Sequence, residues 1–222
     1  YPELQTKLIA AIAAKSTPDV VLLDSPMMPY FAKNGQLVAL DDYIKGKDGV
    51  DLNDFYSGLY ADGKYDGKQY AWPFARSTPV LYYNKDMFKE AGLPDRAPET
   101  WTEFKEFCTK LTVKDKRVGY AVQLGLTTAH WYFQGMLYAH GNDISDDKYN
   151  ILLDQPTALA GAKYLQDLIK SGVAVAGPDA QGEFTNQRSG IHFGSTGSLT
   201  SIASTAKFAV GVGFIPGEVR RQ

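Results

Sequence analysis

Residues 100–122 read TWTEFKEFCTKLTVKDKRVGYAV and predict a helix followed by a strand. Thr100 and Glu103 have the spacing of a capping box, in which each side chain binds a backbone N–H that the first helical turn leaves unpaired. An apolar stripe at helical spacing follows, formed by Trp101, Phe104, Phe107 and Leu111. The run Gly119–Val122 is typical of a strand. A helix that leads into a strand favours an α/β fold.

The same alternation of patterns continues on both sides of this segment. Helical patterns cover residues 1–15, 27–34, 130–138, 156–170 and 199–206, and extended patterns cover residues 20–23, 80–83, 190–193 and 208–214. Asp66 and Gly67 lie between flanking tyrosines and predict a hairpin turn, because both residue types tolerate positive φ. The sequence therefore predicts the α/β class rather than an all-α or all-β fold.

The run Val20–Leu23 is continuous and apolar, as in a strand that is buried on both faces. It ends at Asp24, Ser25 and Pro26. In open α/β sheets, ligands bind just beyond the carboxyl ends of the strands. Asp24 and Ser25 are therefore predicted to bind a ligand.

Composition restricts the class of protein. The chain has 222 residues, of which 44% are hydrophobic, enough for one large or two modest domains with a real core. Its 23 lysines and arginines nearly balance 25 aspartates and glutamates, so nucleic acid is not a predicted partner. The sequence contains no run of about 18 apolar residues, so it predicts no membrane-spanning helix. Cys108 has no second cysteine to pair with and is predicted to be buried packing.

Residues 194–198, GSTGS, lie between a predicted strand and a predicted helix. Backbone N–H groups and hydroxyls in such a loop can bind an anionic or polyhydroxyl ligand. The alternative is an ordinary strand-to-helix turn in which Ser198 is the helix N-cap. The loop lacks the Gly-Lys pair of a phosphate-binding P-loop and the G-x-S-x-G pattern of a serine hydrolase.

Metal and catalytic sites have little support. His130, His140 and His192 are scattered without metal-ligand spacing, and they are predicted to be structural; neither a metal nor a cofactor is predicted. A rival hypothesis is a carbohydrate-active enzyme in which Asp24 and Glu183 meet across a cleft. Nothing in the sequence places these carboxylates at the roughly 5 to 10 Å that glycoside hydrolysis needs.

Aromatic residues make up 13% of the chain. Aromatic rings offer apolar faces on which a sugar ring can stack, while nearby polar groups bind its hydroxyls. Trp101 belongs to a helical stripe and Trp72 to a hairpin arm, so both are predicted to be structural. Trp131, flanked by His130 and Tyr132, is equally open to a structural role and to that of a stacking platform.

Several motifs occur together in a fixed order. They are LQTKLIAA (4–11), TPDVV (17–21), YDGKQYAWP (65–73), LYYNKD (81–86) and PETW (98–101). Together they resemble the extracellular solute-binding proteins of ABC importers, the family that includes maltose-binding protein. Within that family, the segments STPVLYYNK (77–85), GSL (197–199), AKF (206–208) and GVG (211–213) are most similar to glycerol-3-phosphate-binding proteins.

The resemblance implies a two-lobed periplasmic-binding-protein fold of type II, with polar loops of the two lobes facing a cleft that closes on one ligand. Lobe I would comprise residues 1–83 and 208–222, and lobe II residues 84–207. The chain starts inside a helical pattern and stops shortly after an apolar strand, so we expect it to be incomplete at both ends.

The resemblance also implies ligand contacts. The residues that match the family motifs are Tyr1, Ser77, Ser195, Gly197 and Ser198, with Trp131 or His130 near a stacking tryptophan. Ser77 matches a serine that binds phosphate. Ser25, beside Asp24, stands where the glycerol-3-phosphate-binding proteins carry a glutamate for the glycerol hydroxyls, so the solute is left open among sugars, polyols and glycerol phosphates.

The implied function is that of the substrate-binding subunit of an ABC transporter, which delivers its solute to the transmembrane permease subunits. The resemblance implies a periplasmic or extracellular location with association to the membrane. It also implies a monomer, and it does not imply an enzymatic activity. A solute sensor of the same fold without a transport role is a further alternative.

Overall fold

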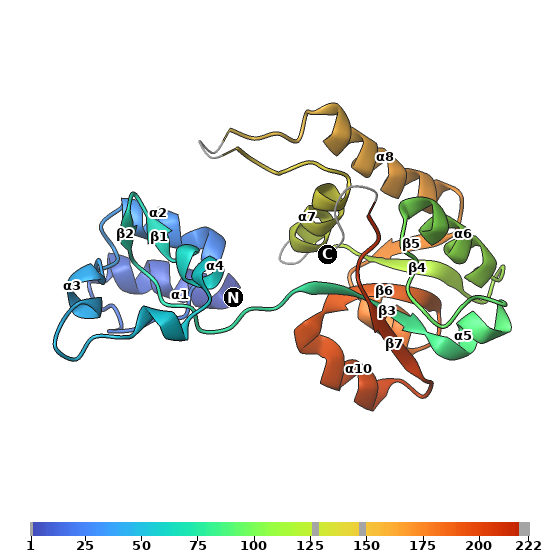
Figure 1. The fold of residues 1–222 in the computed structure, drawn as a ribbon, viewed down its shortest axis with the longest axis horizontal. Helices are drawn as coiled ribbons and strands as arrows, with labels where there is room; N and C mark the ends of the chain where they lie inside the picture. Colours follow the sequence, from blue (N-terminus) through green and yellow to red (C-terminus); the bar gives the residue numbers. More distant parts are fainter. Residues whose placement is uncertain (1, 126–128, 147–149, 218–222) are drawn as a thin grey trace. The chain divides into compact units, whose positions relative to one another are not determined.

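The computed structural model describes residues 2–125, 129–146 and 150–217. The chain separates into two compact units, which we call unit 1 (residues 1–76) and unit 2 (residues 77–222). Unit 1 runs from blue to cyan in Figure 1, and unit 2 runs from green to red. Within the described ranges, no helix is both long and apolar enough to cross a membrane.

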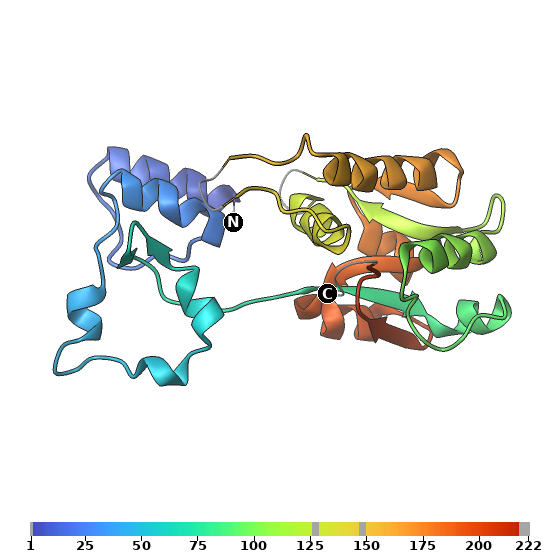
Figure 2. The same ribbon diagram turned by 45° about the horizontal axis from the view of Figure 1, so that its top comes forward.

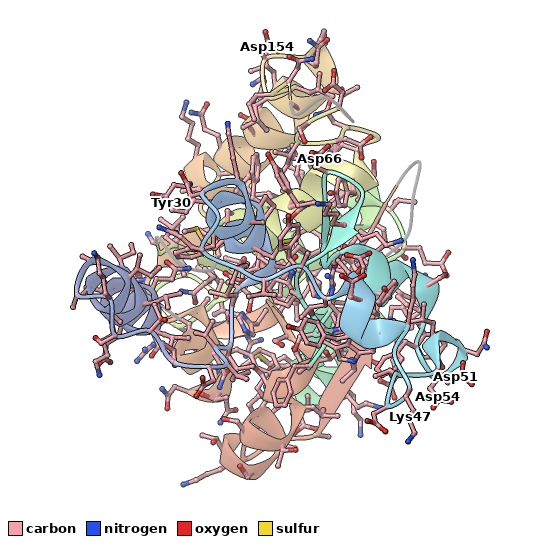
Figure 3. The ribbon with its side chains drawn as sticks, turned by 90° about the vertical axis from the view of Figure 1, so that its left-hand side faces the viewer. Tyr30, Lys47, Asp51, Asp54, Asp66 and Asp154 are labelled. Carbon is pink, nitrogen blue, oxygen red and sulfur yellow. The ribbon has the colours of Figure 1, made fainter. Side chains whose placement is uncertain are left out.

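Unit 1 consists of short helices and one small hairpin. Its elements are α1 (Pro2–Ala13), η1 (Ser25–Met27), α2 (Met28–Lys33), α3 (Asp41–Ile44), η2 (Leu52–Asp54), α4 (Ser57–Ala61), β1 (Lys64–Tyr65) and β2 (Lys68–Gln69). The hairpin prediction is confirmed, because β1 pairs antiparallel with β2 across Asp66 (φ 47°) and Gly67 (φ 76°). Asp66 lies at its tip, and Tyr30 projects from α2 (Figure 3).

The predicted strand at residues 20–23 is wrong. These residues form no helix or strand, and the side chains of Val20 and Leu22 are 87% and 50% exposed. An extended apolar segment becomes a strand only when a neighbouring strand pairs with its backbone. In the described part of unit 1, only β1 and β2 pair, and they pair with each other. Asp24 and Ser25 therefore do not follow a strand.

Unit 2 contains a five-stranded mixed sheet of order β5-β4-β6-β3-β7. Its elements are β3 (Pro79–Asn84), α5 (Lys85–Glu90), α6 (Trp101–Leu111), β4 (Val118–Gln123), α7 (Ala129–Ala139), α8 (Pro156–Lys170), β5 (Ala174–Gly177), α9 (Ala180–Thr185), β6 (Ser189–Ser195), η3 (Thr196–Ser198), α10 (Leu199–Thr205) and β7 (Val210–Gly213). The strands β4, β5 and β6 are parallel, and β3 runs antiparallel to both β6 and β7. The fold class predicted from the sequence is confirmed.

The predicted lobe boundary differs from the division between the units. The prediction assigned residues 77–83 and 208–222 to lobe I, whereas the structure groups them with unit 2. The reason is that β3 and β7 are hydrogen-bonded members of the unit 2 sheet.

Helices cover both faces of this sheet, with α6 and α8 on one side and α10 on the other (Figures 1 and 2). Side chains alternate along a strand, so Leu81 and Tyr83 of β3 join the larger core, and Tyr82 packs with Phe184 and Ile202 in the smaller one. The N-cap bond predicted for α6 is present, since the Glu103 N–H donates to Thr100 Oγ1 at 3.1 Å, and the Glu103 carboxylate accepts from the Glu99 N–H at 2.6 Å.

Candidate functional site

The carboxyl edge of the unit 2 sheet gathers polar groups. The parallel strands β4, β5 and β6 end at this edge, at Gln123, Gly177 and Ser195. Pro79, the first residue of the antiparallel strand β3, pairs with Ser195. The chain therefore enters unit 2, through Ser77, at the same edge where β6 ends.

The segment Ser195–Ser198, which we call the serine loop, joins β6 to α10. Its 3-10 turn is closed by Ser195, whose Oγ accepts a hydrogen bond from the Gly197 N–H at 3.0 Å. Ser198 occupies the N-cap position of α10 without making a side-chain cap hydrogen bond. Ser198 is thus the N-cap residue of α10 by position, as the alternative expected, but the side-chain capping bond of this segment is made by Ser195 at the preceding 3-10 turn.

Ser77 lies against the serine loop. A methyl group built on Gly197 would lie 3.3 Å from the Oγ of Ser77 and 3.3 Å from the Oγ of Ser195. Because residue 197 is a glycine, a small space stays open beside the hydroxyls of Ser77, which is exposed, and Ser195, which is half-buried. Each hydroxyl can donate and accept, so this space suits a hydroxyl or phosphoryl oxygen of a ligand. Three of the predicted site residues meet here.

Three residues outside the predicted ligand set hold this arrangement. Thr196 exchanges two hydrogen bonds with Thr78, because the Thr78 N–H donates to Thr196 Oγ1 at 3.1 Å and the Thr196 N–H donates to the Thr78 carbonyl at 3.0 Å. The fully buried Tyr82 donates its hydroxyl to the Ser195 carbonyl at 2.7 Å. The polar segment Ser-Thr-Pro before β3 could have drawn attention to Thr78. Its hydrogen bonds to Thr196 could not be predicted in this way, because the two residues are far apart in the sequence.

The aromatic residues of α7 approach the same edge. Trp131 is half-buried in the first turn of the helix, and its ring is tilted against that of Tyr132 at a centroid distance of 5.2 Å. Burial raises the pKa of Tyr132, and the Ser195 N–H, which donates to the phenol oxygen, partly offsets that rise. Tyr132 is thus the residue that links α7 to the serine loop, and the stacking role of Trp131 stays a prediction.

A cavity of about 240 Å³ lies between α7 and the ends of β4 and β6. Its walls are mainly aromatic and aliphatic, and they include Tyr120, Val122, Gln123, Tyr132, Phe133, Met136 and Phe193. Typical small-molecule pockets start at about 300 Å³, so this cavity is slightly smaller than that range, and its apolar walls suit the apolar part of a solute.

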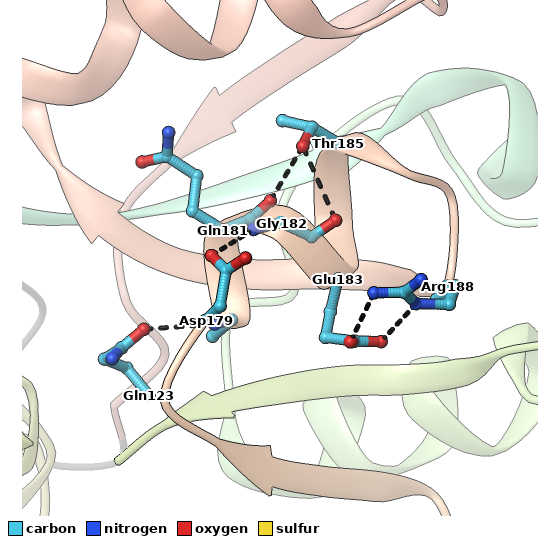
Figure 4. Close-up of polar contacts among 8 residues, drawn as sticks. Gln123, Asp179, Gln181, Gly182, Glu183, Thr185 and Arg188 are labelled. Carbon is cyan, nitrogen blue, oxygen red and sulfur yellow. Dashed lines mark hydrogen bonds and ion pairs between the residues drawn. The ribbon is translucent and has the colours of Figure 1, made fainter. Parts of the chain in front are cut away.

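Gln123 fixes the rim of this cavity. Its Oε1 accepts from the Ala180 N–H at 3.1 Å (Figure 4), and its Nε2 donates to the Pro178 carbonyl at 2.7 Å. These bonds tie the end of β4 to the start of α9. A glutamine with both amide atoms bound to backbone is a rigid support, because its side chain cannot rotate without breaking these bonds.

The remaining predicted ligand residues belong to unit 1. Asp24 is the N-cap residue of η1 without a side-chain cap hydrogen bond, and Ser25 is the exposed first residue of that turn. Tyr1 lies outside the described residues. The ligand roles of these three residues stay predictions.

Glu183, the second carboxylate of the enzyme hypothesis, forms an ion pair with Arg188. Both of its carboxylate oxygens accept from the Arg188 guanidinium, at 2.7 and 2.8 Å (Figure 4). Arg188 directly precedes β6, so this pair lies at the opposite end of that strand from Ser195. Glu183 is therefore not part of the polar edge formed by Ser77 and the serine loop.

Two histidines in unit 2 have structural environments. His192 is 2% exposed between the rings of Tyr82 and Phe184, and burial lowers its pKa to about 4. His140 stacks on Trp101 at 4.9 Å. Among the residues that the structure describes, no group of His, Cys, Asp and Glu side chains is placed to hold a metal ion.

Sequence comparison connects this geometry with known proteins. The sequence profile of the bacterial extracellular solute-binding proteins matches residues 1–221. The sn-glycerol-3-phosphate-binding periplasmic proteins UgpB of Pectobacterium atrosepticum and of Escherichia coli are each 36% identical over 171 residues. The alignment covers 72% of this chain and 38% of those proteins.

Solved structures are similar over almost the whole chain. UgpB from Mycobacterium tuberculosis in complex with glycerophosphocholine has a TM-score of 0.90 and 37% identity, covering 99% of this chain and 56% of that one. A solute-binding protein of an ABC transporter from Thermotoga lettingae, bound to α-D-tagatose, has a TM-score of 0.84 and 27% identity, with 98% and 58% coverage. The chain thus spans little more than half the length of these structures.

Proposed function

Because this chain belongs to the family of bacterial extracellular solute-binding proteins, we propose that it forms the ligand-binding part of a substrate-binding subunit of an ABC importer. The family is periplasmic or extracellular, which is where such a subunit captures its solute. The proposed solute is a sugar, a polyol or a glycerol-3-phosphate-like compound.

One observation carries this proposal. Ser77 and the serine loop, which are far apart in sequence, meet at the carboxyl edge of the unit 2 sheet and border the space that Gly197 leaves open. Hydroxyl donors and acceptors at a sheet edge, beside an aromatic cavity, suit a ligand with several oxygens and an apolar face. Relatives with glycerophosphocholine and α-D-tagatose bound support the same class of solute.

Solute capture would take place between two lobes. We propose that unit 1 belongs to one lobe, which would contribute Tyr1, Asp24 and Ser25, and that unit 2 with its five-stranded sheet belongs to the other lobe. Trp131 would stack on the apolar face of the solute. Closure of the lobes would create the surface that the permease subunits recognise. We propose that the protein acts as a monomer, is associated with the membrane and needs no cofactor.

The family is one of binding proteins and not an enzyme class. We propose that this chain likewise does no catalysis. The Glu183 ion pair with Arg188 supports this, because a carboxylate held by two hydrogen bonds to guanidinium is poorly placed to act as a general acid or a nucleophile.

The test is a thermal-shift screen of the complete gene product that carries this chain. The panel contains maltose, sn-glycerol 3-phosphate and glycerophosphocholine, with sodium phosphate and ethylene glycol as controls. A solute at about 100 times its Kd stabilises the native state by about 2.7 kcal/mol, a shift that is easily measured. We expect a saturable shift with at least one of the three solutes and none with the controls. No shift with any of the three at millimolar concentration would reject the proposed solute class.

A further inference from the structure

We propose that Thr196 is a positioning residue that assembles the binding site, because its hydroxyl holds Ser77 against the serine loop. The role rests on the proposed function, since it concerns the same ligand site. Thr196 lies within the GSTGS motif, but the sequence assigned ligand contacts only to Ser195, Gly197 and Ser198 of that motif and gave Thr196 no role.

Pro79 is the first residue of β3. This residue has no backbone N–H, and it pairs with Ser195 at the end of the β3–β6 ladder. The Thr78 N–H is therefore the last donor before the strand begins. It donates to a side chain, Thr196 Oγ1, at 3.1 Å, while the Thr78 carbonyl accepts from the Thr196 N–H at 3.0 Å.

Two hydrogen bonds between the same pair of residues fix the backbone at Thr78. The preceding residue, Ser77, is exposed, and it is the first residue of unit 2 after the chain leaves unit 1 at Arg76. Fixing Thr78 places the Ser77 hydroxyl beside the space above Gly197. Without the side-chain bond, Thr78 would keep one of its two hydrogen bonds to Thr196, the one that its carbonyl accepts from the Thr196 N–H.

The opposite side of the loop has its own anchor. Tyr82 is fully buried and donates its hydroxyl to the Ser195 carbonyl at 2.7 Å, so the first residue of the loop cannot move freely. Thr196 therefore connects the exposed entry segment at Ser77 and Thr78 to a loop that is held from the core. The exposure of Thr78 and Thr196 means that water can replace the lost bond, so removing the hydroxyl changes stability little.

The variants are Thr196→Val, which removes the hydroxyl and keeps the shape, and Thr196→Ser, which keeps the hydroxyl. Thr200→Val on the exposed surface of α10 is the matched control. In the complete gene product, calorimetric binding of maltose and of sn-glycerol 3-phosphate is measured together with the melting temperature. We expect Thr196→Val to weaken binding at least tenfold, and Thr196→Ser and Thr200→Val to bind within threefold of the parent, all with similar melting temperatures.

Hydrogen exchange of the Thr78 amide in the ligand-free protein gives a readout that needs no solute. Thr196→Val should accelerate this exchange at least tenfold, and Thr196→Ser should restore it. Unchanged exchange in Thr196→Val would overturn the positioning role even if neither solute binds, in which case the solute class proposed above fails separately. Equal loss of affinity in the Val and Ser variants, or a fall in melting temperature that matches the loss, would also overturn it.

Discussion

Replacing Gly197 with alanine fills the space between the Ser77 and Ser195 hydroxyls. The new methyl group would lie 3.3 Å from both oxygens, where a bound ligand oxygen would otherwise approach them. Two hydrogen bonds to the ligand are lost, at about 1 to 1.5 kcal/mol each. Together they amount to about 2 to 3 kcal/mol, so the Kd should rise by roughly 30- to 150-fold.

The fold should tolerate this substitution. The backbone of Gly197 does not adopt the positive φ that would strain an alanine, and the nearest atoms are side-chain oxygens at the surface. Gly58→Ala, where a new methyl group meets nothing within 4 Å, is the matched control in unit 1. Isothermal titration calorimetry with the solute found in the thermal-shift screen measures the Kd of each variant. Binding of Gly197→Ala within threefold of the parent would refute the assignment of this space to the ligand.

Three further predictions concern stability and catalysis. The pKa of His192 is about 4 in the folded protein and roughly 6.5 in the unfolded chain. Between these two values the unfolded chain binds more protons than the folded protein. The free energy of unfolding therefore falls as pH drops through this window, by roughly 3 kcal/mol in total. His192→Phe should flatten this slope in urea titrations at pH 4 to 7. Gln69→Leu should cost about 2 to 4 kcal/mol in chemical denaturation, because buried Gln69 donates to the Tyr60 and Ala71 carbonyls, and a loss below 1 kcal/mol would contradict this reasoning. Glu183→Gln should leave solute affinity unchanged, and loss of a measurable glycoside turnover in this variant would revive the enzyme hypothesis.

Local signals predicted the elements of unit 2 well. The capping box at Thr100, the apolar stripe of α6, and the proline that starts α8 at Pro156 all act within one helical turn, so their effect is visible in the sequence alone. The hairpin at Asp66 and Gly67 was predicted for the same reason. Short elements without such signals, namely α5, β5 and α9, were missed.

Tertiary contacts account for the rest. The apolar run at Val20 looked like a buried strand, yet strand formation depends on a neighbouring strand that its own residues do not encode. The site shows the same limit, because motifs identified Ser77 and the ligand contacts of the serine loop, whereas the role of Thr196 within that loop follows only from its contact with Thr78. Residues whose role is to hold others in place leave no local pattern.

The most direct test of the central claim is a crystal structure of the complete gene product with its solute bound. The account predicts a solute oxygen within about 3.2 Å of both Ser77 Oγ and a polar atom of the serine loop, in the space above Gly197. A solute bound with full occupancy elsewhere, leaving Ser77 and the serine loop in contact with water only, would contradict it.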